Sequence, residues 1–296
     1  MVDHMREPLL SGAELRADPQ LREVAKRNGW TVFPHVKLSD VIDERPEGID
    51  ADTWSYATRA HFDFLVVDLE TRPVFAVEID GLSHADPGTQ QRDRKKDRLV
   101  EKSGFELLRV GVGHLDTGPR GRRLIEYLID ARQFIEAAWA SGYGESDPYF
   151  DPDYRNIIGR GEDGRLSFVN HLSELARRRA LSLRQRRVIP GGVIETLHFS
   201  WRSGWSEAWA WLRVKDDLWL FEKAQVRDFG RFLCGIAPFE LAEDLAARAM
   251  GDALQRFLAG DPAAVRPREM QRDLDAILTQ RDLIEDTIHL DHCRFA

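Results

Sequence analysis

The sequence predicts an α/β protein of two domains, and three observations lead to this fold class. The chain has 296 residues, a length that suggests two domains. Helix-like and strand-like segments alternate in its first half, which is typical of an α/β domain. The second half follows the order helix, three antiparallel strands, helix. We expect an α/β domain over residues 1–145, a linker over 146–164, an α-β-β-β-α (α+β) domain over 165–262, and a C-terminal helix and tail over 263–296.

Composition and charge narrow the class of protein. Hydrophobic residues make up 43% of the chain and charged residues 31%, as in soluble globular proteins. No apolar run is long enough to span a membrane, no signal-peptide core is present, and two cysteines are too few for a disulfide framework. We therefore expect a cytoplasmic protein without a membrane partner. The net charge is −8, yet residues 165–256 hold 15 basic and 11 acidic residues, so a local nucleic-acid-binding surface is compatible with it.

The first domain is expected to begin with a helix that Asp18 caps, Pro19 opens and Asn28-Gly29 ends. Glu14 and Glu23 flank this helix. The elements expected after it are, in order, strand-like segments over 30–33 and 36–38, a polar loop over 43–58, two strands joined by a turn, a helix over 90–102 ended by Gly104, a strand over 105–110 and a helix over 124–139.

Acidic residues stand at the ends of the two strands that a turn joins. The apolar runs 64–67 and 74–77 predict an antiparallel pair. Asp63 begins the first run, and Glu78 and Asp80 follow the second. Paired strand ends bring such carboxylates together, and hard cations such as Mg²⁺ prefer carboxylate oxygens as ligands. The pattern favours metal-assisted phosphoryl chemistry, although Asp63 as a turn cap and Asp80 as part of a turn are the structural alternatives.

Two basic residues are candidates for the same site. With Leu99 and Val100 facing inward on the expected helix, Lys96 lies on the face toward Glu78 and Lys95 is turned further toward solvent. The alternative for Lys96 is a solvated helix face with internal ion pairs. Arg109 lies within an apolar strand, which predicts either an ion pair with an acid near the site or a contact to phosphate.

These residues together resemble the PD-(D/E)XK nuclease superfamily. More narrowly, they are similar to a bacterial domain of unassigned function that is related to very-short-patch repair endonucleases. The resemblance covers roughly residues 15–135, and the strings that carry it are Asp63-Phe64, Glu78-Ile-Asp80-Gly81, His84, Asp93-Arg-Lys-Lys96-Asp97, Gly104 and Arg109-Val110.

The resemblance implies a restriction-endonuclease-like fold and a nuclease that depends on Mg²⁺ or Mn²⁺. Asp63, Glu78 and Asp80 would be the metal ligands, with His84 and Lys96 as further catalytic residues. The superfamily usually has a lysine two residues after the second acid. Asp80 stands there in this chain, so Lys96 on the following helix is the expected substitute. Arg92 and Arg109 would face the nucleic acid, and His84 could alternatively cap the next element.

The second domain is similar to a double-stranded-RNA-binding domain. A helical face of Phe168, Leu172, Leu175 and Ala176 begins it. A strand over 194–201, a hairpin of 207–214 with 218–224, and a helix over Pro238–Leu258 follow. That family grips phosphates with a basic cluster at the start of its last helix, whereas residues 237–244 here are acidic, which puts duplex RNA binding in doubt.

The remaining basic patch of this domain has two interpretations. It either contacts a nucleic-acid backbone or is a solvated helix end whose arginines favour the helix dipole. Its members are Arg177, Arg178, Arg179, Arg184, Arg186 and Arg187. The tryptophans of the domain favour a place in the core over a role as base-stacking platforms.

The sequence thus favours a metal-dependent endonuclease acting on DNA or RNA, in defence against foreign nucleic acid or in repair. Two alternatives stay open. One is a catalytically inactive nuclease fold that serves as a nucleic-acid-binding or scaffold module, because the usual strand lysine is missing. The other is a homodimer formed through the helices and sheet of the second domain.

Overall fold

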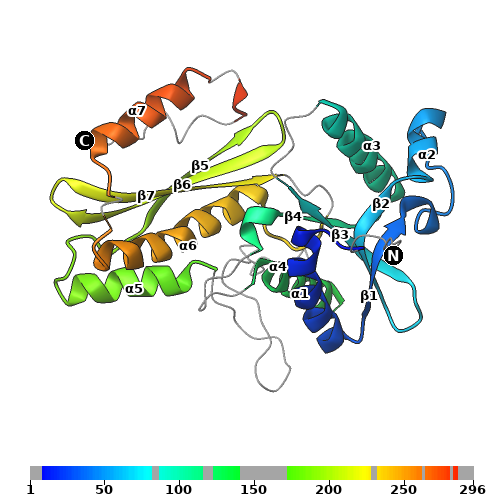
Figure 1. Cartoon of the computed structure of the whole chain (residues 1–296), viewed down its shortest axis with the longest axis horizontal. Helices are drawn as coiled ribbons and strands as arrows, with labels where there is room; N and C mark the ends of the chain where they lie inside the picture. The colour runs from blue at the N-terminus through cyan, green and yellow to red at the C-terminus, as the bar shows by residue number, and fades with distance from the viewer. Residues whose placement is uncertain are drawn as a thin grey trace, which may run out of the picture. The chain divides into compact units, whose positions relative to one another are not determined.

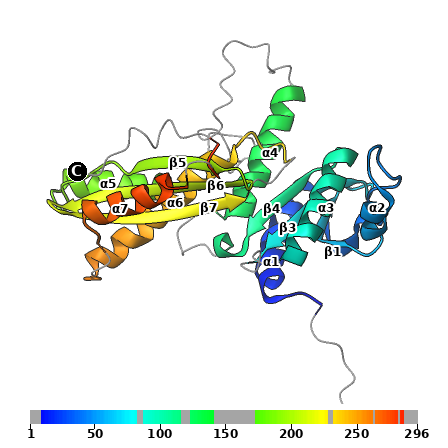
Figure 2. The ribbon, with the colours of Figure 1, turned by 90° about the horizontal axis from the view of Figure 1, so that it is seen from above.

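The computed structural model describes residues 9–81, 87–115, 123–140, 172–227, 232–261, 264–280 and 283–285. This part of the chain is a mixed α/β protein with two sheets and seven α-helices (Figures 1 and 2). Contacts divide it into two compact units. The first lies within Met1–Thr117, Arg122–Glu136 and Phe229–Cys234, and the second within Gly118–Gly121, Ala137–Asp228 and Gly235–Ala296.

The first unit is built on a four-stranded sheet in the order β1-β2-β3-β4. The first three strands are antiparallel, and β4 runs parallel to β3. The strands are β1 (Thr31–Lys37), β2 (His61–Val67), β3 (Pro73–Asp80) and β4 (Leu107–Gly111), and the helices are α1 (Gly12–Asn28), α2 (Ala51–Ala57), α3 (Pro87–Ser103) and α4 (Leu124–Ala140), of which the part up to Glu136 belongs to this unit. The predicted hairpin, the helix that Gly104 ends and the helix after β4 are confirmed.

Helices cover both faces of this sheet. Leu99 and Val100 of α3 join Leu65 and Ala76 in one core cluster, to which α2 contributes Ala57. Because side chains alternate along a strand, the neighbouring Phe75 faces the other side. There its ring meets the ring of Trp30, which follows α1, and the guanidinium of Arg132 from α4. The sheet is therefore buried between helices on its two faces.

Three predictions for the first unit are wrong in detail. The first helix begins at Gly12 instead of Asp18, because Ser11 and Glu14 form a capping box and Pro19 is tolerated inside the helix. Residues 43–58 contain α2, which Asp50 caps by accepting a hydrogen bond from the Thr53 amide at 2.8 Å. The two strand-like segments near residue 35 are one strand, in which His35 takes a left-handed conformation.

The second unit has the predicted order of helix, three antiparallel strands and helix. Its elements are α5 (Glu174–Gln185), β5 (Glu195–Trp201), β6 (Trp205–Lys215), β7 (Leu218–Arg227), α6 (Pro238–Leu258) and α7 (Pro267–Leu278). The α6 helix packs against all three strands and α5 packs against α6. Of the predicted helical face, Leu172 and Ala176 are buried, Leu175 is exposed, and Phe168 lies outside the described residues.

The α7 helix covers the other face of this sheet. Met270 and Leu274 pack against Trp209 and Trp211, so the interpretation of these tryptophans as core residues is confirmed. Val265 exchanges backbone hydrogen bonds with Trp219 at one edge of the sheet. At the other edge, Arg202 N donates to Leu283 O at 2.8 Å and Glu285 N donates to Ser200 O at 2.9 Å. Residues 264–280 and 283–285 therefore occupy one sheet face and part of both edges.

The chain returns to the first unit between β7 and α6. The ring of Phe232 meets the ring of Phe75 edge-on at 5.5 Å, and the Leu233 amide donates to Glu106 Oε2 at 3.1 Å. This connection was not expected from the sequence, in which residues 229–234 lie inside the second domain. No helix in the described part of the chain is long and apolar enough to cross a membrane.

Candidate active site

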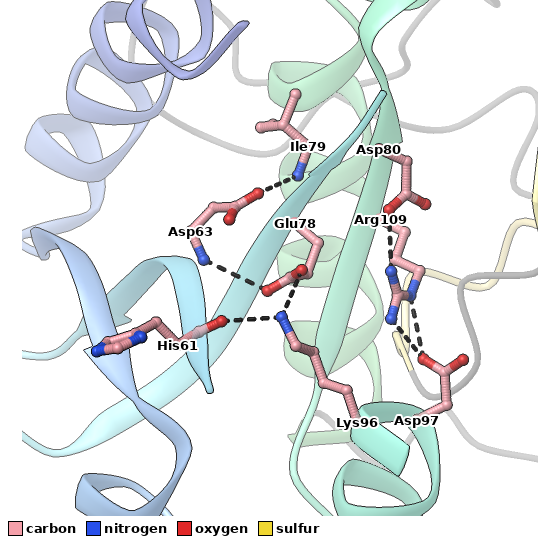
Figure 3. A network of polar contacts seen from close by, with 8 residues as sticks. All are labelled: His61, Asp63, Glu78, Ile79, Asp80, Lys96, Asp97 and Arg109. Carbon is pink, nitrogen blue, oxygen red and sulfur yellow. Dashed lines mark hydrogen bonds and ion pairs between the residues drawn. The ribbon is translucent and has the colours of Figure 1, made fainter. Parts of the chain in front are cut away.

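The candidate site lies where β2 and β3 separate. Their backbone pairing extends to Phe64 and Val77, and Asp63 and Glu78 are the next residues on each strand. Beyond that point the two strands are joined by hydrogen bonds from main-chain amides to side-chain carboxylates (Figure 3). Asp63 Oδ2 accepts a hydrogen bond from the Ile79 amide at 2.8 Å, and the Asp63 amide donates to Glu78 Oε1 at 3.3 Å. The two acids predicted from the sequence are thus brought together by the opening of the hairpin.

Burial makes both carboxylates reluctant to ionise. The pKa of Asp63 is raised chiefly by burial, against the hydrogen bond from Ile79. Burial also raises the pKa of Glu78 to about 7; the charge of Lys96 opposes this rise and that of Asp63 adds to it. Two acids held close together with raised pKa values are typical of a functional site and of a place that favours a cation.

Lys96 reaches this pair of acids and contacts Glu78. Its Nζ donates to Glu78 Oε2 at 2.7 Å and to the carbonyl oxygen of His61 at 2.8 Å (Figure 3). Both Lys96 and Glu78 are buried. Lys95 instead pairs with Asp52 on α2. The helix therefore directs one lysine of the Lys95-Lys96 pair into the site and the other away from it, as the positions of Leu99 and Val100 predict.

Asp80 is engaged by Arg109. The guanidinium Nη1 lies 2.9 Å from Asp80 Oδ1, and Nη2 lies 2.6 Å from Asp97 Oδ1 on α3. Burial by itself would lower the pKa of Arg109, but the charges of Asp80 and Asp97 outweigh it and raise that pKa. Of the two roles open for Arg109, the geometry favours the ion pair over a phosphate contact, because its side chain is only 2% exposed.

This network gives Asp80, one of the three expected metal ligands, a cationic partner. Asp80 shares a face of β3 with Glu78, but its carboxylate is bound by Arg109. No group of three histidine, cysteine, aspartate or glutamate side chains among the described residues is arranged to hold a metal. Of the three acids, Asp63 and Glu78 lie together at the opening of the hairpin, so this pair is the strongest candidate for a shared cation, and the role of Asp80 stays a prediction. His84 lies outside the described residues, and Arg92 is exposed on α3.

A third acid contributes to the electrostatics of the site. The negative charge of Glu14, on the first turn of α1, adds to the rise in the pKa of Asp63. Glu14 Oε2 accepts from the Ser11 amide at 2.9 Å and lies 3.1 Å from Nε2 of His35. The Ser11-x-x-Glu14 capping-box pattern is the sequence signal that places this acid at the start of the helix. Glu23 pairs with Arg123 instead.

The predicted arginine patch of the second unit is divided by the fold. Arg177 donates to Ser173 Oγ at 3.1 Å and to the carbonyl oxygen of Ile194 at 2.9 Å, which makes it a structural residue. Arg178 pairs with Glu174 along α5. Arg179 is partly buried. The exposed members at the end of α5 are Arg184, Arg186 and Arg187. Arg177 is half-buried and uses its guanidinium within the unit, so a phosphate contact by it stays a prediction.

Fold and site define an α/β unit in which a half-buried aspartate, a buried glutamate and a buried lysine lie where a hairpin opens. Residues 6–127 match the model of a family described as Protein of unknown function (DUF2726). An uncharacterized protein, y4bI, from Sinorhizobium fredii (strain NBRC 101917 / NGR234) is 28% identical over 127 residues. That match covers 42% of this chain and 88% of the relative. No solved structure matches the chain.

Proposed function

We propose that this protein is a metal-dependent nuclease with a PD-(D/E)XK-type first unit, and that it hydrolyses phosphodiester bonds of DNA or RNA. The observation that carries the proposal is the placement of Asp63 and Glu78 at the opening of the β2–β3 hairpin, with Lys96 Nζ 2.7 Å from Glu78. The resemblance of the surrounding residues to that superfamily supports it, and it suggests a role in defence or repair.

The two carboxylates fit a Mg²⁺ or Mn²⁺ ion. Mg²⁺ is usually held by one or two protein carboxylates and keeps several waters, so a third protein ligand is not required. Asp63 and Glu78 would hold it. Such an ion lowers the pKa of a bound water and stabilises negative charge on a phosphate.

Residues of the chain supply the rest of the chemistry. Lys96 keeps Glu78 in place and brings a positive charge to a buried position, where it would stabilise the anionic transition state of phosphodiester hydrolysis. Arg109 joins β3, β4 and α3 through Asp80 and Asp97, and so fixes the helix that carries Lys96. Preorganised charges of this kind are usually the largest contribution to such catalysis.

One alternative function is favoured by a specific observation. Asp80 is held by Arg109 and Glu78 by Lys96, so both acids of β3 already have a cationic partner. A nuclease-fold module that binds nucleic acid or another protein without cutting would also show this arrangement.

For the homodimer, the sheet of the second unit is not an available face, because α7 covers it.

A cleavage assay tests the proposal. We expect the full chain to cut labelled single- or double-stranded DNA or RNA with Mg²⁺ or Mn²⁺ and not with EDTA. Asp63→Asn should abolish cutting because the cation loses one of its two ligands. Glu70→Gln removes an exposed acid from the turn of the same hairpin and should leave activity unchanged. Full activity of Asp63→Asn would remove Asp63 from the site.

A further inference from the structure

The second unit carries an arginine-rich surface that includes Arg184 and Arg187 of the predicted patch and extends beyond it. At the end of this unit where the β6–β7 turn lies, the end of α5 stands on one side of the sheet and the start of α7 on the other (Figure 1). Two separate hollows, of about 750 and 460 Å³, flank the turn, and Asp217 lines both. Their basic lining residues are Arg184, Arg187, Lys215, Arg266, Arg268 and Arg272. We call this set the turn-end surface.

We propose that the turn-end surface binds the phosphodiester backbone of the nucleic acid that the first unit acts on. The inference rests on the proposed function for the identity of its partner. It moves the nucleic-acid contact of the second unit away from the middle of α5 and away from the acidic start of α6. Four of the six basic residues come from elements that the sequence patch did not contain.

The charge balance of the surface favours an anionic polymer. Six basic residues line the two hollows against three acids, Asp216, Asp217 and Asp275, in a chain whose net charge is −8. Asp216 is paired with Arg213 at 3.3 Å, and Asp275 accepts from Gln271 at 2.9 Å. The cations are also mainly arginines, whose planar guanidinium matches phosphate oxygens in pairs.

The walls of the larger hollow are fixed by close packing. Gly192 lies against the Arg184 side chain, where an added Cβ would come within 2.3 Å of Cδ. Gly191 lies against the backbone of Arg213, where an added Cβ would be 2.5 Å from the carbonyl oxygen. Arg184 also donates to the carbonyl oxygen of Pro190 at 3.1 Å. The loop after α5 therefore holds its position without a ligand, which reduces the entropic cost of binding.

Arg187 gives the surface its most specific feature. It stands just after α5 with φ = 59°, a left-handed conformation that helix ends usually give to glycine. A residue with a Cβ is strained in this conformation, and the exposed Arg187 side chain gains no burial that would offset the strain. Strain of this kind often marks a functional residue. We assign the Arg187 side chain to the phosphate contact.

Binding in the presence of EDTA separates this inference from the cleavage chemistry. The probes are fluorescein-labelled duplex DNA, duplex RNA and single-stranded DNA, and anisotropy is measured over a range of salt concentrations. The triple variant Lys215→Gln, Arg268→Gln, Arg272→Gln should bind at least about tenfold more weakly near 0.1 M salt, with a salt slope reduced by about 2 to 3. The triple variant Arg178→Gln, Arg179→Gln, Arg202→Gln removes the same charge elsewhere in the unit and should bind like wild type.

Arg187→Gly provides a test with two opposite readouts. Glycine relieves the left-handed strain, so the urea midpoint of unfolding should rise while nucleic-acid affinity falls. The inference is overturned if the turn-end variants bind as tightly as wild type with the same slope, or if wild type binds none of the probes. If wild type binds but does not cut, the nuclease proposal fails and this inference stands.

Discussion

Replacing Arg109 by leucine is expected to lower the free energy of unfolding by about 3–5 kcal/mol, the usual cost of removing one partner from a buried ion pair. Arg109 joins Asp80 on β3 and Asp97 on α3, and its side chain is 2% exposed. The leucine variant leaves Asp80 in a buried position without its arginine. Urea denaturation followed by circular dichroism measures the loss.

Arg72→Leu is the matched control for this change. Arg72 also contacts two carboxylates, those of Asp68 and Glu70, but its side chain is 72% exposed. Exposed ion pairs contribute about 0–1 kcal/mol, so its loss should be small. Equal losses in the two variants would show that the Arg109 network does not hold α3 to the sheet.

Lys96→Met is expected to slow cleavage by about 10²–10³, the usual effect of removing a preorganised charge from beside a developing anion. Methionine keeps the length of the lysine side chain and the apolar nature of its stem, so the helix packing is retained. The contacts that are lost are those of Nζ with Glu78 Oε2 at 2.7 Å and with the His61 carbonyl oxygen at 2.8 Å. Single-turnover rates at fixed Mg²⁺ measure the effect, and circular dichroism confirms folding.

Lys95→Met is the control on the same helix. Lys95 pairs with Asp52 on α2, outside the site, and surface changes of this kind usually have small effects. Its rate should remain close to that of wild type. A Lys96→Met enzyme that cuts at the wild-type rate would show that another residue supplies the charge, and would end the role inferred from the Glu78 contact.

Local sequence patterns predicted the parts of the fold that depend on local physics. The β2–β3 hairpin follows from two apolar runs and a turn, and α6 begins at Pro238 and ends at Leu258 as its periodicity predicts. The same patterns predicted that Asp63 and Glu78 lie together and that Lys96, not Lys95, faces the site, and the contacts of these residues agree. These relations depend on strand pairing and helical spacing, both of which can be read from neighbouring residues.

Other features depend on contacts between distant residues. Asp18-Pro19 has the form of a helix start, but the capping box of Ser11 and Glu14 begins the helix earlier. The place of Arg109 within an apolar strand indicated an ion pair with an acid near the site, but not that this acid is Asp80, which lies 29 residues earlier and carries the same signal as Glu78. The covering of the tryptophan face by α7 and the return of Phe232 to the first unit likewise have no local signal. Such features require tertiary packing and could not be predicted from spacing alone.

The most direct test of the central claim, that Asp63 and Glu78 hold a divalent cation together, is a calorimetric titration of Mn²⁺ into the full chain. We expect binding that is tighter near pH 8 than near pH 6, because the cation competes with a proton on Glu78, whose pKa is about 7. Binding should be lost in Asp63→Asn and retained in Glu70→Gln. Absence of binding to wild type, or equal binding to wild type and Asp63→Asn, would contradict the account.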